Sequence, residues 1–458
     1  MANKKIVVIG SGPGGYVSAI RAAQLGADVA VLEKGFSGGV CLNSGCIPTK
    51  SLLYSAGALN MMKNAGELGI HVENVRPDFE KIEKRKNEAV SRLRKGVEYL
   101  LKKNGVRLVR GKGVLREKGK VVVEAESGAG EELGCDAVII ATGSVPAMPR
   151  VFGHDGRRII TSNEALNVSS VPETVLIVGA GAIGLEFACI YSAFGAKTTV
   201  VEMMEQILPG EDNEIAGVLE KSLKSRGVDI ITGDSVKEIS AGESGVSAVL
   251  ASGKEISAGV CLVAAGRTPS RDGIELESLA VNDRGFFIVN ERMETGEPGI
   301  YAIGDAAGGW LLAHKASAEG IVAAENACGL DSAMDYRSVP KCVYTFPETA
   351  SAGISEAEAR EQGMKVKSGK FPFSALGKAV VSGETGGLVK FVIEEETHEI
   401  LGVQIVGPHA TELISEISLA MRLEALPEDI AEAVHPHPTL SESVMEAARA
   451  VMGAGIHS

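Results

Sequence analysis

The sequence has little that would suit a membrane, a nucleic acid or a secreted scaffold. Only 4% of its 458 residues are aromatic, and seven are cysteines. No stretch approaches about 18 uninterrupted apolar residues, so we expect no transmembrane helix. Positive charge is in deficit, since 46 Lys and Arg face 59 Asp and Glu for a net charge of −13. This balance argues against nucleic acid or an anionic membrane surface as a partner.

The cysteines are too sparse for a disulfide-stapled scaffold. Five of them stand alone in mostly apolar surroundings, and no Cys/His cluster has metal-ligand spacing, so we expect no metal site. These five are Cys135, Cys189, Cys261, Cys328 and Cys342. The basic start and the apolar run Ile6–Ile9 imitate a signal peptide, but the run is too short and leads into a glycine turn. We expect a cytoplasmic enzyme of roughly three domains.

The remaining two cysteines, Cys41 and Cys46, follow a glycine-rich turn by about thirty residues. Five residues of regular helix separate Cα atoms by roughly 7.5 Å along the axis, beyond the usual reach of a disulfide. The residues that permit non-helical backbone here are Gly38, Gly39, Asn43 and Gly45. Pro48 suits the first turn of a following helix. The segment predicts a redox-active disulfide at a helix N-terminus; two buried structural cysteines are the alternative.

An internal repeat organises the first part of the chain. Each copy has three turn glycines after an apolar strand pattern and an acidic residue at the end of the next one. The first copy has Gly10, Gly12, Gly15 and Glu33, and the second has Gly179, Gly181, Gly184 and Glu202. Each residue of the second set lies 169 positions after its counterpart. Two such turns in register predict two dinucleotide-binding domains.

The turn chemistry is the same in both copies. The glycines make the turn, admit the pyrophosphate and pack helix on strand, while the acid binds a ribose hydroxyl. Each copy closes in a strand and turn, with Thr142 and Gly143 in the first and Gly266 in the second. The first copy is longer by 46 residues between opening and closing glycines. We expect that excess in the segment with the cysteine pair and the charged helical stretch 79–104.

The nucleotides can be assigned from the chemistry. A nicotinamide does not reduce a disulfide directly, whereas a flavin accepts a hydride and exchanges electrons with a thiolate. We therefore assign FAD to the first turn and a nicotinamide dinucleotide to the second. Glu202 is followed by Met203 and Met204, with no Arg for a 2′-phosphate, which favours NAD over NADP.

Asp305 ends a short strand pattern, and a helix is expected after it, through Ala327. We expect Asp305 to contact the sugar chain of the flavin; the alternative is a turn residue or a helix N-cap.

From about residue 336 the pattern changes to an α+β domain with a half-exposed sheet. Strands are expected at 388–393 and 400–406, and helices at 410–423 and 439–452. Thr439 and Glu442 have the spacing of a capping box. The alternative is a pair in which Glu442 orients His437 as the base that moves a thiol proton. The redox cysteines favour the base.

Residues 3–452 resemble the flavin-dependent pyridine nucleotide–disulfide oxidoreductases, and within them the members that oxidise dihydrolipoamide with NAD. The motifs that carry the resemblance are Gly10–Gly15, Cys41–Lys50, Gly179–Glu186, Tyr301–Asp305, Leu312–Lys315 and His437–Glu442. The fold this implies is α/β, with two Rossmann-like domains and a C-terminal α+β dimerisation domain. The implied boundaries are 1–147 for FAD, 148–270 for NAD, 271–335 completing the FAD site and 336–458 for the interface.

The resemblance also implies residue roles. Cys41 exchanges with substrate, Cys46 faces the flavin, and Lys50 lies by the flavin and pairs with Glu186. Further expected cofactor contacts are Gly113 and Ala313. The resemblance implies a homodimer in which His437 and Glu442 come from the partner subunit. Two departures from the family pattern are Pro436, and Phe346 where a histidine is common.

The mechanism expected from these parts begins with His437, which deprotonates dihydrolipoamide for attack on the disulfide. The expected partners are lipoyl domains of 2-oxo acid dehydrogenase complexes or the lipoyl protein of glycine cleavage. Glutathione, trypanothione or mercuric reductases share the cysteine motif. The first two would want basic residues near Glu202, and the third an additional C-terminal cysteine pair. A non-catalytic flavin-binding scaffold is the alternative outside the enzymes.

Overall fold

A computed structural model describes residues 4–124, 130–169 and 171–457 of the chain. The chain divides into two compact units. The first unit consists of Met1–Leu52, Asp78–Ala147 and Gly266–Asp335, and the second of Leu53–Pro77, Met148–Ala265 and Tyr336–Ser458. Within the described ranges, no helix combines the length and the apolar composition that a membrane crossing requires.

The first unit is built on a five-stranded parallel sheet with the strand order β18-β7-β1-β2-β3. Its strands are β1 (Lys5–Ile9), β2 (Asp28–Glu33), β3 (Arg107–Arg110), β7 (Ala137–Ile140) and β18 (Ile300–Ala302). Among the residues of β1, β7 and β18, only Lys5 is exposed. Parallel strands that are covered on both faces have such continuous apolar sequences, and the predicted α/β class is confirmed.

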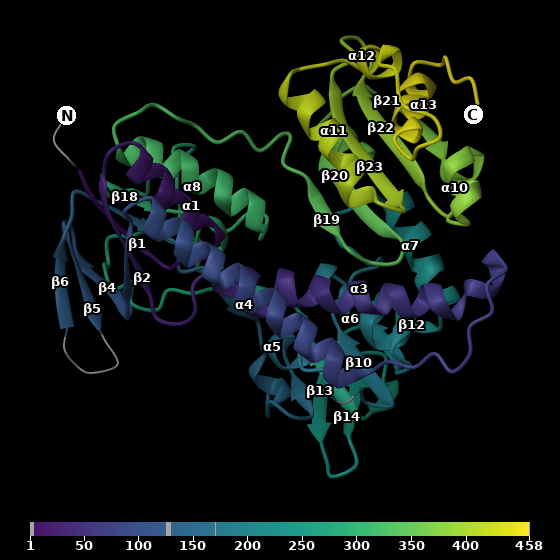
Figure 1. The fold of residues 1–458 in the computed structure, drawn as a ribbon, viewed down its shortest axis with the longest axis horizontal. Helices are drawn as coiled ribbons and strands as arrows, with labels where there is room; N and C mark the ends of the chain where they lie inside the picture. Colours follow the sequence, from purple (N-terminus) through teal and green to yellow (C-terminus); the bar gives the residue numbers. More distant parts are fainter. Residues whose placement is uncertain (1–3, 125–129, 170, 458) are drawn as a thin grey trace. The chain divides into compact units, whose positions relative to one another are not determined.

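Two parallel helices pack side by side on this sheet (Figure 1). They are α1 (Pro13–Gln24) and α8 (Ala313–Ala327). Arg21 of α1 pairs with Glu325 of α8 at 2.5 Å. Near their N-termini the helices approach so closely that a Cβ at Gly14 would come within 2.9 Å of Ala316 O. The N-termini of α1 and α8 therefore lie together at one end of the first unit.

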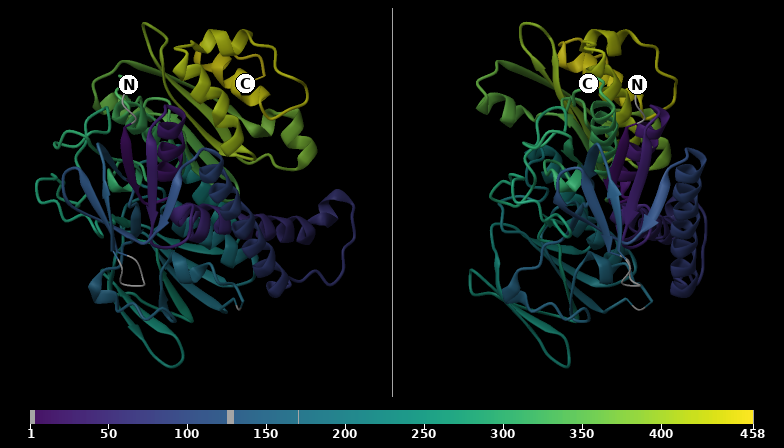
Figure 2. Two further views of the ribbon diagram at one scale, coloured as in Figure 1. Left: turned by 60° about the vertical axis from the view of Figure 1, so that its left-hand side comes forward. Right: turned by 90° about the vertical axis from the view of Figure 1, so that its left-hand side faces the viewer.

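The predicted charged helix is α4 (Phe79–Lys103), which begins where Asp78 accepts a hydrogen bond from the Lys81 amide. It packs against β3 and α1 (Figure 2). A small antiparallel sheet completes the first unit. Its strands are β4 (Lys112–Glu117), β5 (Lys120–Glu124) and β6 (Gly130–Gly134), and a two-stranded ribbon pairs β8 (Ser144–Pro146) with β17 (Arg267–Pro269).

The second unit contains a sheet of the same design, with the order β12-β11-β10-β16-β9 and all pairs parallel. Its strands are β9 (Ile159–Ile160), β10 (Thr174–Val178), β11 (Lys197–Val201), β12 (Val228–Ile231) and β16 (Val260–Val263). The helices with it are α5 (Ser162–Ala165), α6 (Ala182–Ala193) and α7 (Asn213–Ser225). A second antiparallel sheet contains β13 (Val236–Ala241), β14 (Val246–Leu250) and β15 (Glu255–Ala258).

The predicted repeat is confirmed element by element. The starts of β10, α6 and β11 each lie 169 positions after those of β1, α1 and β2. The extra length of the first copy falls between β2 and β3, as expected. The elements there are α2 (Gly39–Ser44), α3 (Cys46–Lys63), the 3-10 helix η1 (Ala65–Leu68) and α4.

The C-terminal part of the second unit is an antiparallel sheet with the order β19-β20-β23-β22-β21. Its strands are β19 (Lys341–Val343), β20 (Glu348–Gly353), β21 (Val366–Pro372), β22 (Leu388–Glu394) and β23 (Ile400–Gly407). Its helices are α9 (Glu356–Glu361), α10 (Gly377–Ser382), α11 (Ala410–Arg422), α12 (Pro427–Glu432) and α13 (Glu442–Val451).

The prediction that this sheet is half exposed is wrong. Alternate residues of β22, such as Val389 and Phe391, pack in one core with residues of α11 and α13. Lys390 between them points to the other face, where it bonds Asp212 at the start of α7 at 2.9 Å. Because α7 also packs on β23, the central strands are buried on both faces.

Candidate active site

The first glycine turn needs glycine for steric reasons. Gly10 has a φ of +103°, and a Cβ there would collide with the carbonyl of Ala141. A Cβ at Gly15 would collide with the carbonyl of Gly10. Both restrictions recur in the second turn. Gly179 has a φ of +104°, and a Cβ at Gly184 would collide with the carbonyl of Gly179.

The acidic residues of the two copies make matching main-chain bonds. Glu33 accepts the amides of Ser11 at 3.0 Å and Gly35 at 2.7 Å. Glu202 accepts those of Ala180 at 2.7 Å and Met204 at 2.9 Å. The donors of the second copy again lie 169 positions after those of the first. Each carboxylate thus ties its turn to the end of the neighbouring strand and retains acceptor capacity, because a carboxylate has about four lone-pair sites.

The helices that begin at the two glycine turns, and α8, carry no side-chain cap at their N-termini. These N-termini are the starts of α1 at Gly12, α6 at Gly181 and α8 at Leu312. Uncapped amides at a helix N-terminus suit the phosphates of a dinucleotide. The first unit presents two of them together, so its residues fit a bound FAD. The second unit presents one, above the buried Glu202, and fits a bound NAD.

Asp305 lies in the 3-10 helix η3 (Gly304–Ala306), which follows β18 and precedes α8 in the chain. It caps no helix, since the residue before η3 is Ile303. Its carboxylate accepts a hydrogen bond from Ser144 Oγ, and Arg267 Nε lies 3.8 Å away. Arg267 also donates to Ser144 Oγ at 2.7 Å. Burial lowers the pKa of Arg267, and Asp305 opposes that shift.

A buried ion pair between Lys315 and Glu319 bonds the main chain on both sides of η3. Sequence reasoning missed this pair. Lys315 Nζ lies 2.9 Å from Glu319, and both side chains are 2% exposed. Glu319 accepts the amide of Gly304 at 2.7 Å, and Lys315 donates to the carbonyl of Gly308 at 2.6 Å. Two opposite charges four residues apart on one helix face were the available signal.

The other expected cofactor residues lie nearby in the first unit. A Cβ at Gly113 in β4 would come within 2.8 Å of Leu32. Thr142 Oγ1 donates to the carbonyl of Ser270 at 2.6 Å, and Ala313 is the first residue of α8. Gly143 and Gly266 both have positive φ, at +71° and +110°.

The cysteine pair spans a break between two helices. Cys41 lies in α2 and Cys46 begins α3, so the predicted non-helical backbone is confined to Gly45 between them. A Cβ at Gly45 would come within 3.2 Å of Cys41 Cα. Close packing at this break brings the two cysteines together without a continuous helix.

The two cysteines are hydrogen-bonded to each other. This hydrogen bond raises the pKa of Cys41, and burial raises it further, while the charge of Lys50 lowers it. The raised pKa favours the protonated form of Cys41. Lys50 lies one turn after Cys46 in α3.

The redox segment lies directly on the first glycine turn. Gly38 donates its amide to the carbonyl of Ser11 at 3.0 Å, and a Cβ at Gly39 would come within 2.6 Å of Gly12 Cα. The predicted proximity of the cysteines to the dinucleotide turn is thus present within the first unit.

A clamp from α4 holds the segment from the other side. Arg94 Nε donates to Asn43 Oδ1 at 2.9 Å, and its guanidinium lies 3.8 Å from the ring centroid of Phe36. Asn43 in turn donates to the carbonyl of Gly39 at 2.9 Å. Sequence reasoning gave Asn43 a backbone role and missed Arg94.

In the second unit, Glu186 is buried in α6 and accepts the amide of Tyr344 at 3.1 Å. His437 Nδ1 lies 2.8 Å from Glu442 Oε1, and the His437 side chain is 76% exposed. Burial raises the pKa of Glu442, but hydrogen bonds from the Thr439 amide and from His437 outweigh this, so the pKa is lowered overall. The expected helix from Thr439 begins instead at Glu442.

Two dinucleotide turns and a thiol pair beside the first define a disulfide oxidoreductase that works through bound dinucleotides. Comparison with known families agrees. Residues 4–320 match the model described as pyridine nucleotide-disulphide oxidoreductase, and residues 339–448 match its dimerisation domain. The chain belongs to the pyridine nucleotide-disulphide oxidoreductase family.

Similar proteins support this along the whole chain. A dihydrolipoyl dehydrogenase of Bacillus subtilis is 44% identical, over 99% of this chain and 98% of its own. One of Thermus scotoductus is also 44% identical, over 100% and 99%. Among solved structures, LpdA from Mycobacterium tuberculosis has a TM-score of 0.92 at 28% identity, covering 97% of this chain and 99% of that one. The HOCl-induced flavoprotein disulfide reductase RclA from Escherichia coli has a TM-score of 0.85 at 28% identity, with the same coverage.

Proposed function

We propose that the protein oxidises dihydrolipoamide to lipoamide and reduces NAD to NADH, the activity for which its curated relatives are named. The observation that carries the proposal is the thiol pair Cys41–Cys46, hydrogen-bonded and lying on the first glycine turn. A dithiol placed beside a dinucleotide site is the arrangement that electron transfer between a substrate dithiol and a flavin needs.

Membership of this family implies FAD and NAD as cofactors. The turn with Gly10, Gly12 and Glu33 would hold FAD, together with Asp305 and the N-terminus of α8. The turn with Glu202 would hold NAD. Bound there, FAD would supply the two-electron chemistry that links the enzyme dithiol to NAD.

The protein side of the reaction is thiol–disulfide exchange. A substrate thiolate attacks Cys41 Sγ, the Cys41–Cys46 bond breaks, and the electron pair goes to Cys46. The second substrate thiolate then displaces Cys41, which closes the lipoamide disulfide and leaves the enzyme dithiol. The raised pKa of Cys41 supports this division, because a protonated Cys41 leaves Cys46 as the electron-rich sulfur. Lys50 and Glu186 complete the proposed site around Cys46.

The proton of the substrate thiol goes to His437. Its pairing with Glu442 supports this role, since a carboxylate at Nδ1 leaves Nε2 as the basic nitrogen. We further propose that His437 and Glu442 serve the cysteines of the partner subunit in a homodimer. The exposure of the His437 side chain and the presence of the family's dimerisation domain support an intersubunit site.

The proposed domains are 1–147 for FAD, 148–270 for NAD, 271–335 as the completion of the FAD domain and 336–458 for dimerisation. Two of these boundaries, at 147 and 335, coincide with those of the compact units. The proposed substrates are lipoyl groups on 2-oxo acid dehydrogenase complexes or on the lipoyl protein of glycine cleavage. We propose a cytoplasmic location, in keeping with the sparse cysteines of the sequence.

Steady-state kinetics test the proposal. Dihydrolipoamide and reduced glutathione are each offered with NAD and with NADP, and formation of the reduced nucleotide is followed. We expect high kcat/KM only for dihydrolipoamide with NAD. Faster oxidation of glutathione, or no oxidation of either thiol by the flavin-loaded protein, would refute the assignment.

A further inference from the structure

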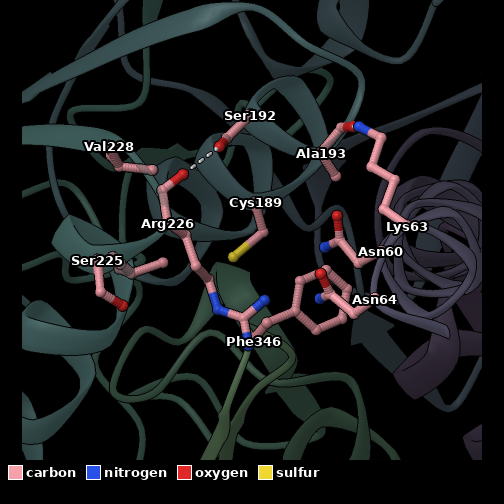
Figure 3. A pocket seen from close by; sticks show the side chains of 11 residues that line it. Asn60, Lys63, Asn64, Cys189, Ser192, Ala193, Ser225, Arg226, Val228 and Phe346 are labelled. Carbon is pink, nitrogen blue, oxygen red and sulfur yellow. Dashed lines mark hydrogen bonds between the residues drawn. The ribbon is translucent and has the colours of Figure 1, made fainter. Parts of the chain in front are cut away.

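The second unit has a cavity of about 340 Å³ that plays no part in the proposed reaction. Its walls come from the end of α3, the end of α6, the end of α7 and the loop before β20 (Figure 3). Cavities of roughly 300–1,000 Å³ with a few convergent polar groups are typical of small-molecule sites. This one is at the small end of that range.

The charge of the lining is one-sided. Lys63 and Arg226 are the charged residues of the wall, and no acidic residue lines it. Burial raises the pKa of the lining Cys189 to about 12, so this thiol adds no negative charge. Asn60 and Asn64 add two carboxamides, each with N–H donors. The cavity therefore offers many donors and a net positive charge.

The carboxyl ends of α6 and α7 explain the presence of only part of this positive charge. Helix C-termini carry partial negative charge, which attracts cations. Lys63 compensates the partial negative charge at the end of α6, because its Nζ donates to the carbonyl of Ala193 at 2.9 Å. Arg226 behaves differently: within the described residues its guanidinium forms no hydrogen bond or ion pair, and it extends toward Asn60, Asn64 and Phe346 (Figure 3). Its five N–H donors face the cavity unused.

Phe346 supplies an apolar wall that is fixed in place. Its amide donates to the sulfur of Cys189, and Ser222 Oγ donates to its carbonyl at 3.3 Å. Its ring packs on α3, where a Cβ at Gly57 would come within 3.3 Å of the ring. The ring is therefore held by main-chain bonds at one end and by the helix at the other. An organic body can pack on its free side.

We propose that this cavity binds a small organic anion, whose carboxylate or phosphate pairs with Arg226 and whose body packs on Phe346. A planar guanidinium grips such oxyanions with two parallel hydrogen bonds. The carboxamides of Asn60 and Asn64 and the ammonium of Lys63 supply further donors. The site shares no residue with the two dinucleotide turns or with the Cys41–Cys46 pair, and it goes beyond the proposed function.

Calorimetric titration of the flavin-loaded, NAD-saturated protein tests this, because NAD occupies the phosphate site of the second turn. The organic probes are succinate for a carboxylate and glycerol 3-phosphate for a phosphate ester, in buffer of low ionic strength. Inorganic phosphate serves as the probe without an organic body. We expect saturable binding of at least one organic probe, at one per chain and with a Kd below about 1 mM. The tighter organic probe identifies the anionic group.

Variants identify the site. Arg226→Ala should weaken the bound probe by about tenfold or more, and Arg226→Lys by less, because an ammonium keeps the charge without the fork. Asn64→Asp should also weaken it, through like-charge repulsion. Lys224→Ala is the matched control: it removes a positive charge two residues from Arg226 and outside the lining, and binding should be unchanged.

Three results would overturn the inference. They are no saturable binding of either organic probe, equal binding by wild type and Arg226→Ala, and binding of inorganic phosphate as tight as that of both organic probes. The Arg226 side chain is exposed and makes no bonds, so its variants should keep the flavin content and melting temperature of wild type. The readout is binding, so its outcome is independent of the dihydrolipoamide assay.

Discussion

Glu442 divides its carboxylate between His437 and the main chain of Thr439. Oε1 lies 2.8 Å from His437 Nδ1, and Oε2 accepts the Thr439 amide at 2.8 Å. Thr439 Oγ1 donates instead to the carbonyl of Pro436, so only one half of the expected capping box forms. One side chain thus both stabilises the start of α13 and orients the imidazole.

Replacement of His437 by Ala should lower the rate of dihydrolipoamide oxidation by roughly 10²–10⁴-fold, because the base is lost. Hydride exchange between reduced flavin and NAD analogues needs no thiol proton and should survive. Stopped-flow absorbance separates the two half-reactions. The control is His398→Ala, since His398 forms a similar pair with Glu428 at 2.7 Å but plays no part in the proposal. Equal rates for both variants would contradict the role of His437.

Mixed dimers test whether two chains build one site. Cys46→Ser and His437→Ala proteins should each be inactive, for want of the sulfur or of the base. After subunit exchange, hybrid dimers should hold one working site each, so activity should partly return. Exchange can be verified with differently tagged subunits and native mass spectrometry. Verified exchange without any recovery would place the base and the cysteines of one site in a single chain.

The two cysteines should differ in their spectra. Reduction of wild type by two electrons should give a long-wavelength charge-transfer band, because an electron-rich Cys46 thiolate lies against an electron-poor flavin. Cys46→Ser should abolish the band, whereas Cys41→Ser should show it already in the resting enzyme. Visible absorbance during anaerobic dithionite titration measures both. The reverse pattern would exchange the roles of the sulfurs.

Glu202 should exclude NADP, because the 2′-phosphate would meet a buried carboxylate. Combining Glu202→Ala with Met203→Arg should shift the ratio of kcat/KM for NADP and NAD toward NADP by at least about tenfold. Glu205→Ala is the control, as it removes a nearby acid outside the proposed ribose contact. Equal use of the two nucleotides by wild type would disprove the assignment.

Glu356 should make stability depend on acid pH. The hydrogen bond from Arg360 lowers its pKa, burial opposes this, and Lys390 lowers it further, to about 2 from 4.5. A lowered pKa stabilises the folded state above pH 4.5, and this contribution is lost as the pH falls from 4.5 toward 2. Glu356→Gln should therefore lower the free energy of unfolding at pH 7 by about 2 kcal/mol and flatten this part of the profile.

Denaturant titrations between pH 7 and pH 3 measure the effect. The control is Glu396→Gln, because Glu396 forms an exposed pair with Lys365. Such pairs contribute about 0–1 kcal/mol. A Glu356→Gln profile parallel to that of wild type would show that the carboxylate is not responsible.

The local parts of this fold could be predicted from sequence, because they depend on neighbours in the chain. Glycine turns, their acids and the insertion around Cys41 and Cys46 all have short-range signals. The partners of Asp305 could not be found in this way. Ser144 and Arg267 reach it through the β8–β17 ribbon, whose strands are more than a hundred residues apart in sequence.

The prediction of a half-exposed C-terminal sheet failed for a similar reason. Its strands show enough alternation to suggest one solvent face, and Lys390 looks like an exposed residue in that pattern. The structure buries it because α7, from a distant part of the chain, places Asp212 opposite. A buried charge is tolerated only with such a partner, and the partner is invisible to periodicity.

The matching bonds of Glu33 and Glu202 bear on how such a chain arose. Two strand–turn–helix–strand modules that agree in length, in strained glycines and in the amides each acid binds are what duplication of one ancestral module leaves behind. The cysteine-bearing block lies between β2 and β3, and the order β7-β1-β2-β3 of the strands around it is the same as the order β16-β10-β11-β12 in the second copy. Flavin and nicotinamide chemistry thus differ here by what was added to a common scaffold, so the inherited module by itself does not choose its nucleotide.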